Sequence, residues 1–176
     1  MKGVEMLKVG GSLTGEVSSL CYNSKNCHEN SLFVAISGLK SDGHDYIPEA
    51  IALGARFIVH EKGYLSFPGV TAIKVVNSRR ALGILAKNFY LHPSSLMFLI
   101  GVTGTNGKTT VTYLMESIFQ AAGLSVGVLG TVNYRFKGKV LAAPNTTPES
   151  FEMQKILREM VEDGITHVIV EVSSCR

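Results

Sequence analysis

Long apolar runs, clusters of basic residues and an apolar leader are all missing from this sequence of 176 residues. The apolar stretch near its middle, residues 96–102, is far too short to span a bilayer. Residues 1–5 lack the apolar core of a signal peptide. The net charge of +3 is spread along the chain, and no run of Lys or Arg resembles a nucleic-acid-binding arm. We therefore expect neither membrane insertion nor a nucleic-acid partner.

Cysteine is also scarce. The chain has an odd number of cysteines, and their spacing is not that of metal ligands; they are Cys21, Cys27 and Cys175. We interpret them as reduced thiols of a cytoplasmic protein rather than as a disulfide framework. Apolar residues make up 45% and charged residues 18% of the chain, close to ordinary globular usage. This composition predicts a packed core, and we expect a monomer.

In the first half of the sequence, short apolar runs alternate with helical patterns. Strands are expected at residues 31–36, 56–60 and 70–76, and helices at residues 47–54 and from residue 78 onward. The cluster His92-Pro93-Ser94-Ser95 breaks regular structure and indicates a domain boundary near residue 93. Residues 1–93 are thus predicted to form a small α/β domain.

In residues 94–176 the alternation is clearer. The sequence predicts strands at residues 96–102, 125–129 and 167–171, with helices at residues 111–122 and 153–161 between them. Strands that alternate with helices predict a parallel sheet with crossover helices, and the continuous run 96–102 is typical of a strand buried on both faces. Three strands are fewer than a doubly wound sheet usually has, so we expect the first part of a longer protein. A complete small sheet is the alternative.

A glycine-rich loop, Gly104-Thr105-Asn106-Gly107-Lys108-Thr109-Thr110, lies between the first of these strands and the helix after it. Glycines allow successive backbone N–H groups to point at an anion, and the helix N-terminus adds partial positive charge. Lys108 can reach the β- and γ-phosphates, and the Thr109 hydroxyl can bind Mg²⁺. The loop is a variant, because Val102 stands where the P-loop pattern has glycine. We predict ATP with Mg²⁺ here; the absence of Gly-x-Gly-x-x-Gly counts against NAD.

Glu171 ends the third strand of this half. In a parallel sheet the carboxyl ends of the strands face the same crevice as the phosphate loop. A carboxylate there can hold the Mg²⁺ that bridges the phosphates. The alternative is a solvated glutamate at a strand end. Ser173 and Ser174 follow directly and could face the same crevice.

Several motifs together resemble the Mur ligase family. In the second half they are the loop at 104–110, then Asn145-Thr146-Thr147-Pro148, then Glu171-Val172-Ser173-Ser174, in the family's order. Three segments of the first half resemble the family's uridine-binding domain: Tyr22-Asn23-Ser24-Lys25, Leu32-Phe33-Val34-Ala35 and Asp42-Gly43-His44-Asp45-Tyr46. The similarity extends over nearly the whole chain. It implies a uridine-binding domain over residues 1–93, followed by the first part of a P-loop ATPase domain with a parallel sheet over residues 94–176.

The resemblance also implies an activity, that of an ATP-dependent acid–amino-acid ligase of peptidoglycan precursor synthesis. ATP would phosphorylate the free carboxylate of UDP-MurNAc-L-Ala-D-Glu. The amine of a diamino acid, meso-diaminopimelate or L-lysine, would then attack the acyl phosphate. By motif, Lys108 would act in catalysis and Thr109 and Glu171 would hold Mg²⁺. The positions implied for substrate contacts are Asn145, Thr146, Thr147 and Ser173 for the UDP-MurNAc-dipeptide, and Tyr22, Ser24, Leu39, Lys40 and Ser41 for uridine.

Two of these motifs also have a local structural interpretation. Thr146 and Glu149 have the spacing of a capping box, and Pro148 suits a first helical turn, so this segment could simply begin the following helix. The segment from Tyr22 to Lys25 could be a plain turn, because Asn and Ser favour turns.

The sequence departs from the family at two motifs. Asn23 and Lys25 stand where the family usually has Asp and Arg, and lysine cannot form the planar fork of arginine. Cys175 stands where the family usually has histidine. Two other functions stay open: a related ligase such as folylpolyglutamate synthetase, in which the phosphate loop comes near the start of the chain, and a nucleotide-binding module without catalysis.

Overall fold

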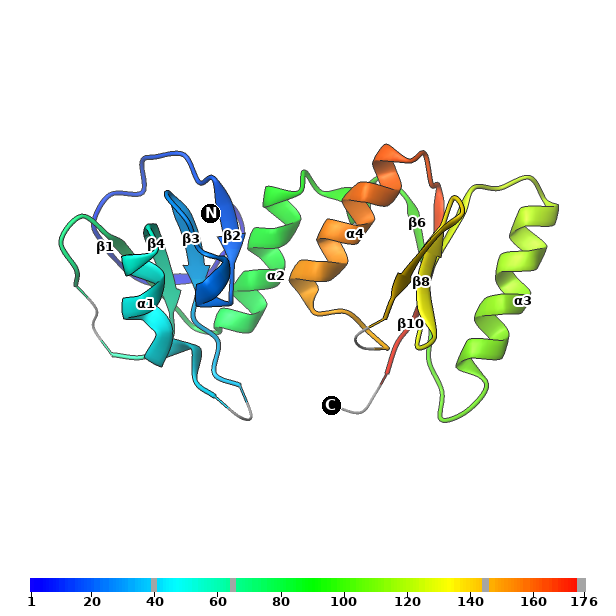
Figure 1. Ribbon diagram of the computed structural model, residues 1–176, viewed down its shortest axis with the longest axis horizontal. Coiled ribbons are helices and arrows are strands. Elements are labelled where there is room, and N and C mark those ends of the chain that lie inside the picture. The colour runs from blue at the N-terminus through cyan, green and yellow to red at the C-terminus, as the bar shows by residue number, and fades with distance from the viewer. Residues whose placement is uncertain (39–40, 64–65, 144–145, 174–176) are drawn as a thin grey trace. The chain divides into compact units, whose positions relative to one another are not determined.

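The chain forms two five-stranded sheets, each in its own unit, over residues 1–89 and 90–176 (Figure 1). This computed structural model describes residues 1–38, 41–63, 66–143 and 146–173. The α/β class expected from the alternation is confirmed, but both sheets are mixed rather than parallel throughout. The units divide four residues before the boundary predicted from the breaker cluster.

The first unit is built on a sheet with the order β1-β5-β4-β3-β2. Its four parallel strands are β2 (Ser19–Cys21), β3 (Ser31–Val34), β4 (Ala55–His60) and β5 (Thr71–Val75). Strand β1 (Met6–Gly10) pairs with β5 in the antiparallel direction. The sequence did not predict β1 and β2, because short strands at a sheet edge carry little periodic signal.

Helices cover both faces of this first sheet. Alternate residues of a strand point to opposite faces. On one face Phe33 and Ile58 pack with Ile47 of α1 (Ile47–Ala52). On the other face lies α2 (Ser78–Phe89), which follows β5. Two short 3₁₀ turns, η1 (Ser24–Asn26) and η2 (Gly43–Tyr46), contact α1.

The second unit has the order β6-β10-β7-β8-β9. Its parallel core consists of β6 (Phe98–Val102), β7 (Val126–Leu129) and β10 (His167–Glu171), the three strands that the sequence predicts. An antiparallel hairpin, β8 (Asn133–Phe136) and β9 (Lys139–Ala142), extends it beyond the prediction. Lys137 and Gly138 form its turn with φ of 46° and 76°, as the tight two-residue hairpin turn requires.

Helices also lie on both faces of the second sheet (Figure 1). Met115 and Phe119 of α3 (Lys108–Ala121) pack on Val128 and Ile169. On the opposite face, Leu157 and Met160 of α4 (Ser150–Glu162) pack in a cluster with Val168, Tyr134 and Phe136. A 3₁₀ turn, η3 (Pro93–Ser95), precedes β6 and contacts α4.

The expectation that residues 96–102 form a strand buried on both faces is wrong. Phe98 is 72% exposed and Leu99 is 42% exposed. The reason is the strand order, which places β6 at an edge of the sheet with β10 on one side of it. A continuous apolar run cannot by itself distinguish a central strand from an edge strand. Among the helices that the structure describes, none has the length and apolar character needed to cross a membrane.

Candidate nucleotide and metal site

The loop of residues 103–107 connects β6 to α3, as the sequence predicts. Gly104 and Gly107 have φ of +151° and +78°, values that L side chains rarely adopt. Gly107 is the N-cap of α3, so Lys108, Thr109 and Thr110 form its first turn. Thr105 and Asn106 lie exposed at the tip of the loop. The backbone therefore forms a cradle that opens toward solvent at a helix N-terminus, the arrangement that binds phosphate groups.

Lys108 is directed back over this cradle. Its Nζ donates a hydrogen bond of 2.8 Å to the carbonyl oxygen of Gly104, the residue at the other end of the loop. The side chain is only partly buried, so its ammonium group can exchange this weak neutral acceptor for a phosphate oxygen. A charged acceptor makes the stronger hydrogen bond.

Glu171 lies at the carboxyl end of β10 and is 1% exposed. Its Oε2 accepts a hydrogen bond of 3.1 Å from the Thr109 hydroxyl, so the two predicted metal ligands are adjacent. Burial at a strand end excludes the alternative of a solvated glutamate. Among the described residues no Lys, Arg or His forms an ion pair with it. A buried carboxyl group without a cationic partner is costly, and a bound cation would offset that cost.

Three further residues hold this carboxyl group, and the sequence did not single them out. Thr131 donates to Oε2 at 2.9 Å, and the buried Thr112 approaches Oε1 at 3.5 Å. Gly130 packs so closely against Oε1 that a side chain at this position would have to displace the carboxyl group. Two features of the sequence could have pointed to these residues. Thr112 follows Lys108 by one helical turn, and Gly130-Thr131 follows a buried strand.

The expected substrate loop reaches the same strand end. The Thr147 hydroxyl donates to the carbonyl oxygen of Glu171 at 3.0 Å and accepts from the backbone N–H of Ser173 at 3.0 Å. The Thr146 hydroxyl lies 3.2 Å from that of Thr131. Thr147 thus fixes the loop to β10, while Thr146 is the hydroxyl that faces the site. Asn145, Ser174 and Cys175 lie outside the described residues.

The capping-box interpretation of this segment is wrong. Helix α4 begins at Ser150, its N-cap is Glu149, and no side-chain hydrogen bond caps it. Thr146 and Pro148 therefore precede the helix instead of starting it. The Thr146 hydroxyl contacts Thr131 rather than the first turn of α4.

The expected uridine residues lie in the first unit. Ser24 is buried in η1, where its hydroxyl donates to Glu49 Oε2 at 2.5 Å, and Tyr22 is partly buried. Asn23 is the N-cap of η1 and accepts from the N–H of Lys25, so this segment is a capped turn. Ser41 is exposed; Leu39 and Lys40 lie outside the described residues.

The two described cysteines flank this turn. Cys21 and Cys27 are free and buried, with their Sγ atoms 2.7 Å apart. The short contact and burial raise the pKa of Cys21, and the hydrogen bond to Cys21 lowers that of Cys27.

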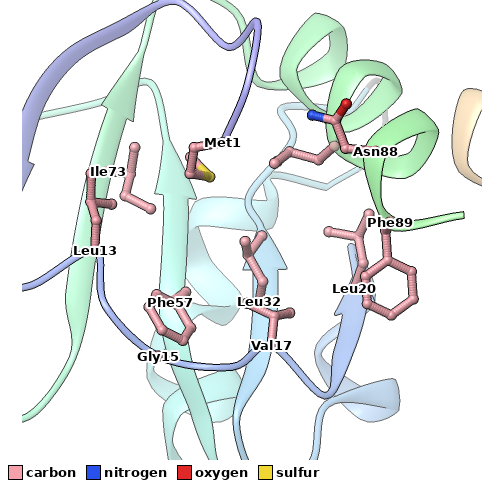
Figure 2. A pocket seen from close by; sticks show the side chains of 11 residues that line it. Met1, Leu13, Gly15, Val17, Leu20, Leu32, Phe57, Ile73, Asn88 and Phe89 are labelled. Atoms are coloured by element: carbon pink, nitrogen blue, oxygen red, sulfur yellow. The ribbon is translucent and has the colours of Figure 1, made fainter. Parts of the chain in front are cut away.

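An apolar cavity of about 270 Å³ also lies in the first unit, between the sheet and α2. Figure 2 shows Leu13, Leu20, Leu32 and Phe57 directed into it, with Asn88 as the labelled polar side chain. Ser24 belongs instead to the face of the sheet that α1 covers, through its partner Glu49. A cavity with this lining offers few hydrogen-bonding groups for a uridine nucleotide, so we do not place the nucleotide there.

Two family models match the chain. The description "Mur ligase family, catalytic domain" fits residues 16–90, and "Mur ligase middle domain" fits residues 102–176. The chain belongs to the Mur ligase family. The second match contains the phosphate loop and Glu171, so the site described above lies in the middle domain of a Mur ligase.

A relative from Clostridium tetani, named UDP-N-acetylmuramoyl-L-alanyl-D-glutamate--2,6-diaminopimelate ligase, is 41% identical over 99% of this chain and 36% of its own length. A solved structure of a ligase with the same name has a TM-score of 0.76 at 23% identity, covering 90% of this chain and 32% of the other; it shows the fold. The MurF ligase from Thermotoga maritima in complex with ADP has a TM-score of 0.60 at 26% identity, with the same coverage. The chain spans about a third of the length of the curated relatives it matches.

Proposed function

We propose that this chain is the nucleotide-binding part of an ATP-dependent ligase that adds a diamino acid to UDP-MurNAc-L-Ala-D-Glu. The single observation that carries the proposal is the contact of Thr109 with the buried Glu171, beside a glycine cradle covered by Lys108. This geometry suits a magnesium nucleotide. The names of the relatives supply the substrate and the diamino acid, 2,6-diaminopimelate.

The residues present fit Mg²⁺. No group of three or more His, Cys, Asp or Glu side chains that could enclose a metal occurs among the described residues. Mg²⁺ does not need one, since it is usually held by one or two carboxylates, water and substrate phosphates. Glu171 would supply the carboxylate and Thr109 a hydroxyl oxygen. When bound, Mg²⁺ would neutralise charge on the phosphate oxygens.

The remaining chemistry is electrostatic stabilisation and positioning. In the first step a substrate carboxylate oxygen attacks the γ-phosphorus of ATP, and ADP leaves with the electrons of the broken P–O bond. In the second step an amine attacks the acyl carbon, loses a proton and expels inorganic phosphate. Lys108 would hold the transferring phosphoryl group, while Thr146 would contact the reacting substrate.

We assign the other end of the substrate to the first unit. Tyr22, Ser24 and Ser41, with Leu39 and Lys40, would contact the uridine. Of these residues the capped turn η1 would hold Ser24, with Asn23 in place of the family's usual Asp as its capping acceptor. A cytoplasmic location and a monomeric state remain predictions.

Calorimetric titration tests the proposal directly. The chain should bind MgATP and, separately, UDP-MurNAc-L-Ala-D-Glu; failure to bind either one would contradict the assignment. We expect no tripeptide product from these 176 residues alone, because no residue here is assigned to the incoming amine. A protein of the relatives' full length should form it. Any ATP-dependent product from this chain by itself would contradict the prediction that ligation requires a protein of the relatives' full length.

A further inference from the structure

Cys21 and Cys27 form a pair of thiols at the two ends of one surface turn. Cys21 is the last residue of β2 and Cys27 is the C-cap of η1, so the segment between them contains the whole turn. Their Sγ atoms are 2.7 Å apart, closer than non-bonded sulfur atoms normally approach. A disulfide bond is about 2.0 Å long, so the two atoms need to approach by only about 0.7 Å to form one.

The fold holds the two sulfur atoms in this contact. Both thiols are buried in an apolar cluster with Phe33 and Ile47. Pairing of β2 with β3 fixes the backbone of Cys21, and the N–H of Cys27 donates to the carbonyl oxygen of Ser24 at 2.9 Å. The native structure therefore supplies a proximity that an unfolded chain reaches only by chance encounter.

The two thiols differ in reactivity. Cys27 lies in a turn in which its neighbours Asn26 and His28 are exposed, whereas Cys21 lies in the sheet. The hydrogen bond from Cys21 lowers the pKa of Cys27, while the same contact and burial raise the pKa of Cys21. Because the thiolate is the nucleophile in thiol–disulfide exchange, Cys27 is the thiol that reacts first when the turn opens.

We propose that Cys21 and Cys27 are a reversible oxidation site, at which a low-molecular-weight disulfide converts the two thiols into a disulfide bond that locks the turn η1. Cys27 attacks one sulfur of the oxidant, and the other sulfur leaves as a thiolate with the electrons of the broken S–S bond. Cys21 then attacks Cys27 Sγ and expels the second thiolate. The two cysteine protons pass to the two thiolates released, so the oxidant is reduced to two thiols.

The bond would close a ring over residues 21–27. Opening of η1 requires the ends of this segment to separate, and a cross-link removes that freedom. Ser24, one of the residues assigned to uridine, lies within the ring. That consequence for the uridine site rests on the proposed function, whereas formation of the bond does not. Thiols would reverse the lock, as is usual for disulfides of cytosolic proteins.

Trypsin provides a direct test, because Lys25 lies between the two cysteines. The whole chain is equilibrated with oxidised and reduced glutathione, alkylated and digested. Cleavage after Lys8, Lys25 and Lys40 should release residues 9–25 and 26–40 joined by a bond that dithiothreitol breaks. The native chain should oxidise at a glutathione ratio at least about tenfold more reducing than the chain unfolded in urea, because the fold holds the sulfur atoms in contact.

Two variants test the order of attack. Both carry Cys175→Ser, which leaves Cys21 and Cys27 as the cysteines of the chain. With Cys21→Ser added, Cys27 should retain glutathione as a mixed disulfide. With Cys27→Ser added, Cys21 should stay largely unmodified until urea exposes it. Equal incorporation of glutathione into the two native variants would overturn the assignment of Cys27 as the attacking thiol.

Amide hydrogen exchange tests the lock. The N–H groups of Lys25, Asn26 and Cys27 are hydrogen-bonded within the turn. They should exchange at least about tenfold more slowly in the oxidised chain than in the reduced chain, because the cross-link opposes local opening. The matched control is η2, which has no cysteine and whose N-cap Asp42 accepts from a backbone N–H as Asn23 does in η1. Its exchange should not change.

The oxidation site is overturned if the native chain gives no joined peptides, or if it oxidises at the same glutathione ratio in buffer and in urea. Unchanged exchange in η1 after oxidation overturns the lock. These measurements use neither MgATP nor UDP-MurNAc-L-Ala-D-Glu, so their failure leaves the proposed function intact.

Discussion

Gly130 lies against the carboxyl group of Glu171, so that a Cβ atom at position 130 would come within 2.5 Å of Oε1. The backbone of Gly130 has no positive φ, so close approach rather than conformation requires glycine here. The contact fixes one face of a carboxyl group that the hydroxyls of Thr109 and Thr131 hold from other directions.

Gly130→Ala should therefore displace Glu171 from the Thr109 hydroxyl. We expect a lower thermal midpoint and at least about tenfold weaker Mn²⁺ binding, measured by electron paramagnetic resonance of free Mn²⁺. Gly101→Ala is the matched control on the neighbouring strand β6, because its Cβ would meet Val172 at 3.4 Å, an ordinary contact. Unchanged Mn²⁺ binding in Gly130→Ala would show that the close approach has no functional role.

Glu171→Gln should have opposite effects on stability and on metal binding. It removes a buried charge that has no ion-pair partner among the described residues, so the free energy of unfolding should not fall. Each kcal/mol gained would raise the melting temperature by about 2–4 °C in a chain of this size. Mn²⁺ affinity should fall because a neutral amide is a poor ligand for a hard cation.

Glu116→Gln is the contrasting control for that prediction. Glu116 accepts from Nε and Nη2 of Arg135 at 2.8 and 2.6 Å, so the loss of its charge leaves a partly buried guanidinium without its ion-pair partner. It should lower the melting temperature and leave Mn²⁺ binding unchanged. If Glu171→Gln melts lower than the parent, the carboxyl group contributes to folding and the buried charge is not a cost.

Lys108→Ala should weaken MgATP binding. Loss of a charge-assisted contact to the phosphates typically costs about 1.5–3 kcal/mol, or roughly one to two orders of magnitude in affinity. Calorimetric titration measures this directly. Lys155→Ala removes an exposed lysine from α4 and should bind like the parent. Equal affinities for the parent and Lys108→Ala would refute the phosphate role of this loop.

The stability of the first unit should fall in mild acid because of His60. This residue is 2% exposed, and its Nδ1 donates to the carbonyl oxygen of Lys62 at 2.9 Å. Burial lowers the pKa of His60 below its ordinary value of 6.5. The unfolded chain therefore binds a proton more readily than the folded chain. The stability that the neutral ring contributes is complete above pH 6.5 and is lost as the pH falls from there toward the folded pKa.

Urea unfolding at pH 7.5 and pH 5.5 measures this effect. His60→Asn keeps a donor for the Lys62 carbonyl and cannot titrate, so its loss of stability between the two pH values should be smaller than the parent's. His92→Asn changes an exposed histidine whose φ of 56° suits asparagine, and it should behave like the parent. Equal pH dependence in His60→Asn and the parent would mean that another group causes the loss.

Much of the fold follows from local pattern in the sequence. The apolar stripe of residues 111–122 predicted α3, and the sequence also predicted all three strands that form the parallel core of the second sheet. The hairpin β8–β9 was missed because β8, Asn133–Phe136, lacks the short apolar run that marked the equally short strands β3 and β7. The exposure of β6 was missed because strand order arises from pairing between distant segments, which an apolar run does not record.

The same division applies to the site. The sequence alone determined the phosphate loop and its family, since Gly104, Gly107 and Lys108 act through local backbone geometry and a fixed spacing. It also placed Glu171 at a strand end. Only the tertiary structure decided what surrounds that carboxyl group. Parallel pairing of Val170 with Leu129 brings the next residue of each chain segment, Glu171 and Gly130, side by side. Thr131 and Thr112 became partners of Glu171 because register and helix packing place them there, and hydroxyl groups spread through a sequence carry no signal of that proximity.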